Sequence, residues 1–228
     1  MGKLWLSSDH HFGEDKCRVL RFRPFHSVEA MNERMVELWN HHVAPDDVVI
    51  HLGDFATTEE DVERYAPRLN GEIELLMGNH DHRMPIELLE EHFLRVYEGP
   101  KYLHPGNYWE DPEDENSLWV CHYPVQKNLT FFTVCGHVHE LWKLSRRTLN
   151  VSVDVWQFAP VPIEIVLEYR KRERDNRYDA NVYPDADLRF QWDVTKGSGR
   201  WDGEPTLGAI KGNVLEAGQS QWLGEELE

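Results

Sequence analysis

Long apolar runs and closely spaced cysteines are both missing from this chain of 228 residues. A membrane-spanning helix needs about 18 or more consecutive apolar residues, and no such run exists. The first residues lack the apolar length and small-residue cleavage site of a secretory signal. Cys17, Cys121 and Cys135 are far apart, which argues against a disulfide framework and against a C-x-x-C zinc site. These absences predict an intracellular protein with no membrane partner.

Basic side chains are also scarce. The sequence has 24 Lys and Arg against 41 Asp and Glu, a formal net charge of −17. Long duplex nucleic acids are bound largely through Lys and Arg contacts to phosphates, so we expect no partner of that kind. Histidine, in contrast, is abundant at 13 residues, and several stand in short motifs beside Asp or Asn.

The pattern of apolar residues predicts a layered α/β fold. Short segments rich in β-branched or aromatic residues predict strands at 4–8, 48–52, 73–77, 118–121, 131–135, 149–155 and 163–167. Three- and four-residue spacing predicts helices at 27–42, 58–66 and 85–92, with Ser27 and Thr58 as N-caps. Residues 99–117 predict a hairpin with an acidic tip. We expect a main domain over residues 1–167 and an acidic C-terminal extension over 168–228, flexible or wrapped over the domain.

Polar motifs follow five of the predicted strands: Asp9-His10-His11, Gly53-Asp54, Gly78-Asn79-His80-Asp81, Cys121-His122-Tyr123 and Gly136-His137-Val138-His139. Ligands of layered α/β folds bind at the carboxyl ends of strands, so these loops can converge on one cleft. In extended backbone, residues two apart face the same side, which pairs Asp9 with His11. Imidazole, carboxylate and amide oxygen suit divalent ions such as Mn, Fe, Zn or Ni. The glycines allow the backbones to approach closely.

Other side chains near the motifs are predicted to pack. His10 alternates with its neighbours and therefore points to the opposite face, and His51 precedes its motif within a strand. Cys121 and Cys135 lie in apolar runs typical of buried thiols. Tyr123 and Trp156 could stack on a nucleobase, although core packing is the commoner role of an aromatic residue.

The order of these motifs resembles the pattern of the calcineurin-like metallophosphoesterase superfamily: D-x-H, G-D, G-N-H-D, a lone His and G-H-x-H. The resemblance covers roughly residues 4–167. The segments 9–13, Arg23-Pro24-Phe25 and 150–156 resemble a small branch common in phages and bacteria, although Glu14 stands where that branch often has histidine. The resemblance implies an αββα sandwich of two mixed sheets flanked by helices, with a metal site at the strand ends. It also implies the cytoplasm of a bacterium or of a phage-infected host cell.

The resemblance further implies two divalent metal ions, with manganese favoured and Fe, Zn or Ni as alternatives. The implied ligands are Asp9, His11 and His139 for the first metal, Asn79, His122 and His137 for the second, and Asp54 as the bridge. His80 would lie close to the phosphate as acid or transition-state stabiliser, oriented by Asp81. Two cations about 3.5–4 Å apart can clamp a phosphoryl group and generate hydroxide from a bridging water.

The predicted function is therefore a dinuclear phosphodiesterase acting on small nucleotides, with cyclic nucleotides foremost. A nuclease or a phosphomonoesterase of the same superfamily is the alternative, and the sequence shows no basic stripe with interleaved aromatics for a nucleic-acid path. A third hypothesis is a non-catalytic interaction module, which should have gaps among its ligands. The motifs have none. Neither the substrate-binding residues nor the oligomeric state is predicted.

Overall fold

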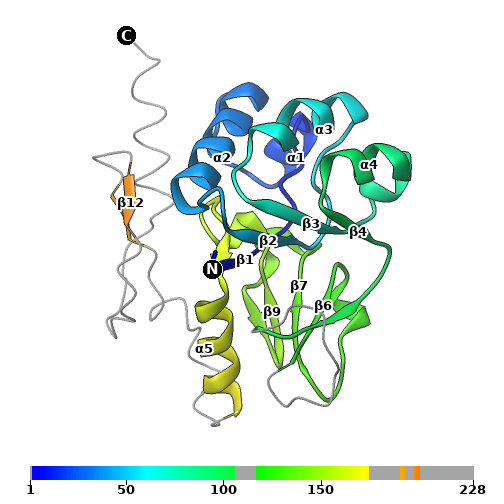
Figure 1. Ribbon diagram of the computed structural model, residues 1–228. Helices are drawn as coiled ribbons and strands as arrows, with labels where there is room; N and C mark the ends of the chain where they lie inside the picture. Colours follow the sequence, from blue (N-terminus) through cyan, green and yellow to red (C-terminus); the bar gives the residue numbers. More distant parts are fainter. Residues whose placement is uncertain (1, 106–116, 175–190, 194–197, 201–228) are drawn as a thin grey trace.

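Two five-stranded sheets form the centre of the computed structural model, which describes residues 2–105, 117–174, 191–193 and 198–200 (Figure 1). The first sheet has the order β10 (Val161–Pro162), β1 (Leu4–Ser7), β2 (Val48–His51), β3 (Glu72–Leu76) and β4 (Arg95–Tyr97). The second has the order β5 (Lys101–Leu103), β6 (Leu118–Cys121), β7 (Phe132–Cys135), β9 (Thr148–Asn150) and β8 (Leu144–Ser145). Both sheets are mixed, because β10, β5 and β8 run antiparallel to their neighbours.

Helices cover the outer face of the first sheet. These are α1 (Asp15–Leu20), α2 (Val28–His42), α3 (Glu59–Tyr65) and α4 (Ile86–His92), seen above the sheet in Figure 1. The alternation of β1 explains the layering: Trp5 packs with Met31 under the helices, whereas Leu4 and Leu6 join Val120 in the core between the sheets. The predicted α/β class, with two mixed sheets flanked by helices, is confirmed.

The predicted helix starts are also confirmed. The side chain of Ser27 accepts a hydrogen bond from the N–H of Ala30 at 3.1 Å. The side chain of Thr58 does the same for the N–H of Asp61 at 3.2 Å. Each bond satisfies a backbone donor that the helix itself leaves open. The arms of the predicted hairpin pair as β5 and β6, and its tip lies outside the described residues.

The predicted strand at 163–167 is wrong. These residues begin α5 (Ile163–Arg174), and the short strand β10 just before them pairs with β1. Ile163, Val166 and Tyr169 are buried at helical spacing, but five apolar-rich residues were too short a window to distinguish a helix from a strand. The segment 149–155 is strand only to Asn150, and Val153–Val155 form a 3-10 turn. The elements α1, β4, β5 and β8 were not predicted individually.

The C-terminal part contains one more described pair of strands, β11 (Gln191–Asp193) and β12 (Ser198–Arg200), which are antiparallel. Helix α5 runs across position 167, and its Tyr169 is buried. The division into a domain over 1–167 and an extension over 168–228 stays a prediction, because most of that extension lies outside the described residues. None of the helices within the described ranges is long and apolar enough to cross a membrane.

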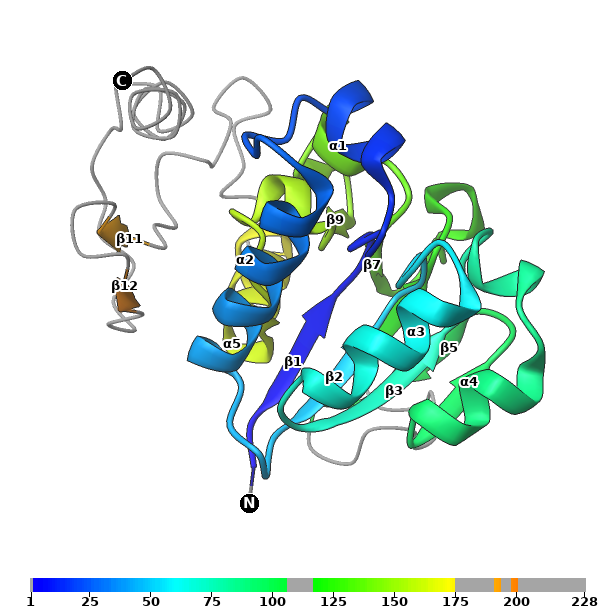
Figure 2. The same ribbon diagram turned by 90° about the horizontal axis from the view of Figure 1, so that it is seen from above.

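The parallel strands bring the polar motifs to one edge of the molecule. β1, β2 and β3 are parallel in the first sheet, and β6, β7 and β9 are parallel in the second. Figure 2 shows β1 running from the N-terminus toward α1. Beyond its end, Ser8 forms a parallel bridge with Ser152, which joins the two sheets where the motif loops begin.

Candidate metal centre

Asp54 lies at the middle of a cluster that contains every predicted ligand. Its Oδ2 is 3.5 Å from Nε2 of His11 on one side and 3.5 Å from Nε2 of His122 on the other. The other oxygen, Oδ1, accepts a hydrogen bond from the backbone N–H of His80 at 2.8 Å. One oxygen is therefore held by the backbone, and the other faces two imidazoles from different sheets.

The inner group consists of Asp9, His11 and His139, and all three are buried. Nε2 of His139 lies 3.9 Å from Oδ1 of Asp9. The His11 and His139 rings are stacked with their centroids 5.0 Å apart. Asp9 accepts hydrogen bonds from Ser8 Oγ at 2.6 Å and from the backbone N–H of His137 at 3.0 Å. The predicted ligands of the first metal thus lie together beneath the surface.

The outer group consists of Asn79, His122 and His137, and it reaches the surface. Nε2 of His122 lies 3.3 Å from Oδ1 of Asn79 and 3.2 Å from Nδ1 of His137. His122 is buried and its Nδ1 is held by the carbonyl of Leu52 at 2.7 Å, whereas Asn79 is half-buried and His137 is exposed. The ring of Tyr123 packs on that of His137 with centroids 4.6 Å apart. The predicted ligands of the second metal therefore adjoin solvent.

The backbone of the cluster is strained. Five of its residues have φ between 49° and 71°, in the left-handed region that side chains disfavour: Asp9, His11, Asp54, His137 and His139. Such a conformation costs on the order of 1–3 kcal/mol per residue and persists where surrounding contacts enforce it. A concentration of this strain at one set of ligand-type side chains points to a functional site.

Glycine makes the close packing of these loops possible. Gly53 itself has φ 95°, and an added Cβ at Gly78 or Gly136 would collide with the carboxylate of Asp54 or Asp9, respectively. The expectation that the motif glycines permit close approach is thus met.

Asp81 ties the loops together through the backbone. Its carboxylate accepts hydrogen bonds from the N–H groups of Asp54 at 2.7 Å, Phe55 at 3.1 Å and Gly78 at 2.8 Å. Burial raises the pKa of Asp81, and the charge of Asp54 adds to the effect. These contacts fix the loop that carries His80, and a direct orienting contact with the His80 ring stays a prediction.

A buried ion pair supports His139 from behind. Nδ1 of His139 lies 2.7 Å from Oδ2 of Asp154, and Arg23 donates to both oxygens of Asp154 at 2.8 and 2.9 Å. Arg23 also donates to the carbonyls of His10 at 2.7 Å and Asp9 at 2.6 Å. A histidine held at Nδ1 by a carboxylate presents Nε2 in a fixed direction, the usual arrangement of a metal-binding imidazole. This pair joins the loop after β1 to the turn at Val153–Val155.

Glu14 approaches the other inner histidine. Its Oε2 lies 2.7 Å from Nδ1 of His11, off the line of a good hydrogen bond. This contact lowers the pKa of Glu14, against the opposing effect of burial. Arg23, Asp154 and Glu14 were not predicted as site residues. Arg23 and Asp154 stand in segments that carried the resemblance, but they are 131 residues apart in the chain. The contact of Glu14 with His11 depends on the turn before α1.

The electrostatic field at the cluster favours a cation. Burial alone would lower the pKa of His122, but the contact with Asp54 and the charges of Asp9 and Asp54 outweigh burial and raise it to about 9. For His139, burial is likewise outweighed by Asp154 and Cys17, and the pKa rises to about 10. Carboxylates that hold protons on buried imidazoles exert the same attraction on a divalent cation, which would displace those protons.

The donor atoms fit divalent metal ions. His11 is 3% exposed, and both of its ring nitrogens are buried without a hydrogen-bond partner among the described residues. Ligand atoms of Asp9, His11 and Asp54 lie within 4.8 Å of one another, and so do those of Asp54, His122 and His137. Buried ring nitrogens that face carboxylates and make no hydrogen bond suit a metal ion, which would satisfy them.

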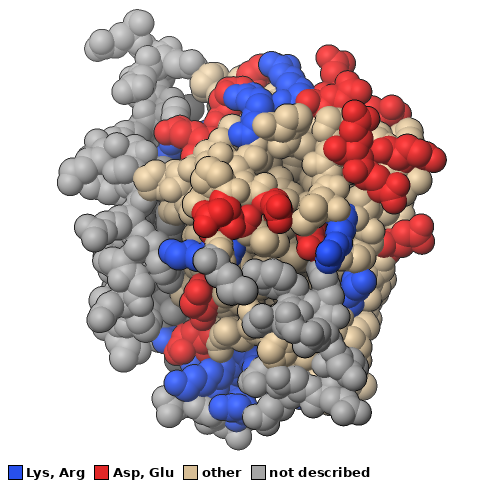
Figure 3. Space-filling view, viewed as in Figure 1, with Lys and Arg blue, Asp and Glu red and all other residues tan. Residues whose placement is uncertain are grey.

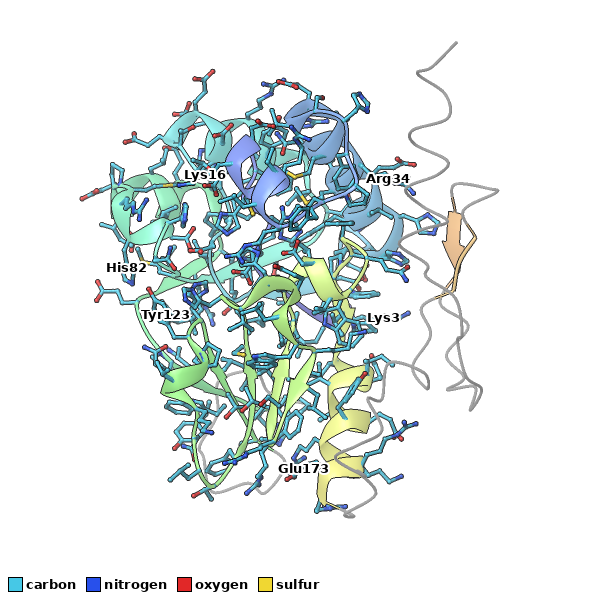
Figure 4. All side chains as sticks on the ribbon, turned by 180° about the vertical axis from the view of Figure 1, so that it is seen from behind. Lys3, Lys16, Arg34, His82, Tyr123 and Glu173 are labelled. Atoms are coloured by element: carbon cyan, nitrogen blue, oxygen red, sulfur yellow. The ribbon has the colours of Figure 1, made fainter. Side chains whose placement is uncertain are left out.

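His80 lies beside the inner group, where ligand-type atoms of His11, Glu14 and His80 are within 4.8 Å of one another. It is half-buried, and its ring meets that of His11 edge-on with centroids 4.6 Å apart. Burial lowers its pKa, and the charge of His11 lowers it further. Figure 4 shows the side of the molecule on which Tyr123 lies, with Lys16 of α1 above it.

Two nearby histidines pack as predicted. His10 is fully buried, with its ring stacked on Phe12 at 5.2 Å and its Nδ1 2.9 Å from Nε2 of His51. Nδ1 of His51 accepts from the N–H of Gly53, so His51 carries its proton on Nε2 and donates it to His10. Both residues support the loop that precedes Asp54.

Comparison with known proteins shows which family the chain belongs to. Residues 2–201 match the model of the family described as calcineurin-like phosphoesterase. An uncharacterized protein of Methanocaldococcus jannaschii is 29% identical over 177 residues, which cover 74% of this chain and 91% of that protein. The gene 66 protein of Mycobacterium phage D29 is 31% identical over 103 residues, or 42% of this chain and 49% of that protein. The phage relative agrees with the small phage and bacterial branch that the motifs resemble.

A solved structure shares the fold. The crystal structure of a protein of unknown function from Aquifex aeolicus superimposes with a TM-score of 0.58 at 20% sequence identity. The similarity covers 74% of this chain and all of that one.

Proposed function

Because the chain belongs to the calcineurin-like phosphoesterase family, and is thus a phosphoester hydrolase, we propose that it is a dinuclear phosphodiesterase acting on small nucleotides. The observation that supports this proposal best is the cluster around Asp54. A carboxylate oxygen that faces imidazoles of both sheets at 3.5 Å suits a bridging ligand between two cations. The inner group would hold one cation and the outer group the other, with manganese as the favoured metal.

Two divalent cations bound there would supply positive charge to the phosphoryl oxygens and activate a water for attack on phosphorus. The protein's own contribution is to hold the ligands in place before the substrate arrives. Asp81 ties the Asp54 loop to the Gly78 loop, and Arg23 ties Asp9 to Asp154. His80, half-buried beside His11, would donate a hydrogen bond to the phosphate or a proton to the leaving oxygen.

The charge of the molecule supports a small substrate. Figure 3 shows Asp and Glu gathered over α3 and α4, and Lys and Arg gathered toward the end of α5, where Lys171, Arg172 and Arg174 stand. Glu173 on the same turn lies apart from Tyr123 in Figure 4. The basic side chains of α5 therefore do not lead to the cluster. A net charge of −17 opposes the binding of a long polyanion, which favours a small substrate.

Hydrolysis of bis-p-nitrophenyl phosphate by metal-stripped protein, with Mn, Ni, Zn or Mg added back, tests the diesterase. We expect nitrophenol release that depends on the added metal and is fastest with manganese. Two bound ions without hydrolysis would contradict a diesterase. Absence of bound metal would contradict the metal site itself and favour a non-catalytic interaction module.

A panel of phosphate esters tests whether the substrate is a small nucleotide. Cyclic nucleotides, an aryl monophosphate, and single-stranded and duplex DNA are compared at equal metal loading. Turnover of cyclic nucleotides above the other compounds supports the proposal. Preference for the monophosphate would identify a phosphomonoesterase, and cleavage of DNA alone would identify a nuclease.

A further inference from the structure

Cys17 lies beside the inner group. It is buried on α1, and its Sγ, a ring nitrogen of His11 and a ring nitrogen of His139 all lie within 4.8 Å of one another. The sequence did not predict this, because Cys17 has no cysteine or histidine partner close to it along α1.

His11 provides an independent sign of a ligand at this position. Its two ring nitrogens are buried without a hydrogen-bond partner among the described residues, although Glu14 and Asp54 are near. A buried imidazole with no hydrogen bond is costly unless another donor or a cation meets it. The sulfur of Cys17 therefore lies within 4.8 Å of a buried imidazole that faces two carboxylates and makes no well-aligned hydrogen bond.

The other two cysteines show what a merely packed thiol looks like here. Cys121 and Cys135 are paired neighbours on β6 and β7 inside the second sheet. Burial raises the pKa of Cys121 to about 12, and that of Cys135 also rises, so both stay neutral thiols. Neither belongs to a group of ligand-type atoms like that of Cys17, among the residues that the structure describes.

We propose that Cys17 is a thiolate ligand of the inner metal ion, in addition to the ligands of the proposed dinuclear site on which this inference rests. One ion joins donor atoms up to twice its bond length apart, about 4.0–4.6 Å for zinc bonds of about 2.0–2.3 Å. The three atoms lie within 4.8 Å of one another, so one ion can join them with at most small side-chain rotations. On binding, the S–H proton leaves to solvent and the sulfur electron pair forms the bond to the metal.

A sulfur ligand makes the two metal positions chemically different. Thiolate favours zinc, iron or cobalt over manganese and magnesium, whereas the outer group offers two imidazoles and an amide oxygen. The inner position therefore retains a softer ion, and the outer position accepts manganese. A mixed metal content follows from the residues of each group.

Cobalt titration of the reduced wild-type protein tests the thiolate. Co²⁺ alone is added to metal-stripped protein, and both bound cobalt and near-ultraviolet absorption are recorded. We expect a sulfur-to-cobalt charge-transfer band that grows with the first equivalent and then stays constant. Two bound cobalt ions without that band would overturn the assignment of Cys17 and leave the dinuclear site intact. No bound cobalt would overturn both.

Cys17→Ala and Cys121→Ala are the matched variants, since each removes one buried thiol. Cys17→Ala should lose the band and at least about tenfold in zinc affinity, the lower limit of what loss of one supporting group costs a metal site. Its manganese affinity should change much less. Cys121→Ala should keep both the band and the affinity. A band that survives in Cys17→Ala would overturn the proposal. If a variant fails to fold, two cobalt ions bound to the wild-type protein without a band would still overturn it.

Discussion

The inner and outer groups contain similar side chains in very different surroundings. Asp9, His11 and His139 are 0%, 3% and 4% exposed, whereas His137 is exposed and Asn79 is half-buried. Inner residues contact further buried or half-buried polar groups, as His139 contacts Asp154. Among the outer residues, His122 is buried against Asp54 and the carbonyl of Leu52, whereas the ring of His137 packs on Tyr123 near the surface. Under the proposed function, we therefore expect the inner half to hold its ion and the outer half to admit the substrate.

This difference has a physical cost. The Arg23–Asp154 pair is almost fully buried, and buried charges are tolerated only when they are paired and hydrogen-bonded. The inner half depends on that pairing for its stability. In the outer half, Asn79 and His137 keep contact with water, so these two side chains can be changed without leaving an uncompensated charge in the core. Four predictions test the comparison, from the largest expected effect to the smallest.

Asp54→Ala should abolish the distinction between the halves by removing the residue that they share. We expect loss of both metals and a fall in turnover of more than about 10³-fold, the upper end of what one stabilising group contributes. Metal content and hydrolysis of bis-p-nitrophenyl phosphate measure the two effects. Asp46→Ala, at an exposed position, is the control. An Asp54→Ala protein that still bound two ions would contradict the bridging role.

His80→Ala should lower turnover by about 10²–10⁴-fold, as expected for loss of a proton donor or transition-state stabiliser. Both metals should stay bound, because His80 is not one of the proposed ligands, although its ring contacts that of His11. His82→Ala changes a nearby exposed histidine and should leave turnover and metal content unchanged. If His80→Ala loses a metal, then His80 is a ligand and the assignment is wrong.

Asp154→Ala should destabilise the metal-free protein by about 3–5 kcal/mol, because it leaves the charge of Arg23 buried without its partner. His137→Ala, in the outer half, should change the free energy of unfolding by no more than about 0.5 kcal/mol, as is usual at an exposed site. Urea unfolding in the presence of a chelator measures both. Equal losses would remove the energetic difference between the halves.

Glu14→Gln keeps the size of the side chain but removes the charge near Nδ1 of His11. We expect metal affinity at the inner position to fall by about 10–100-fold, the usual effect of losing a supporting carboxylate, and the outer position to be unchanged. Calorimetric titration resolves the two positions, with Glu29→Gln at an exposed position as control. A similar loss at both positions would show that Glu14 acts on the whole cluster.

Much of the site was predictable because its donors come in local motifs. The ligand-type residues follow strands, and the carboxyl ends of parallel strands meet at one edge. The supporting residues were not predictable in this way. Arg23 and Asp154 are 131 residues apart, and no pattern within either segment indicates the other. The start of α5 was wrongly predicted as a strand for a different reason. The five residues 163–167 are too few to show the helical period.

The sequence by itself determined the donor types, their order and the strands that they follow, because spacing and alternation act over a few residues. Only the tertiary structure decided which donors are buried, which face water, and that Cys17 lies next to His11 and His139. Burial depends on how α1 and the strand-end loops close over one another. That closure joins residues far apart in the chain, so the inner and outer halves exist only in the folded protein.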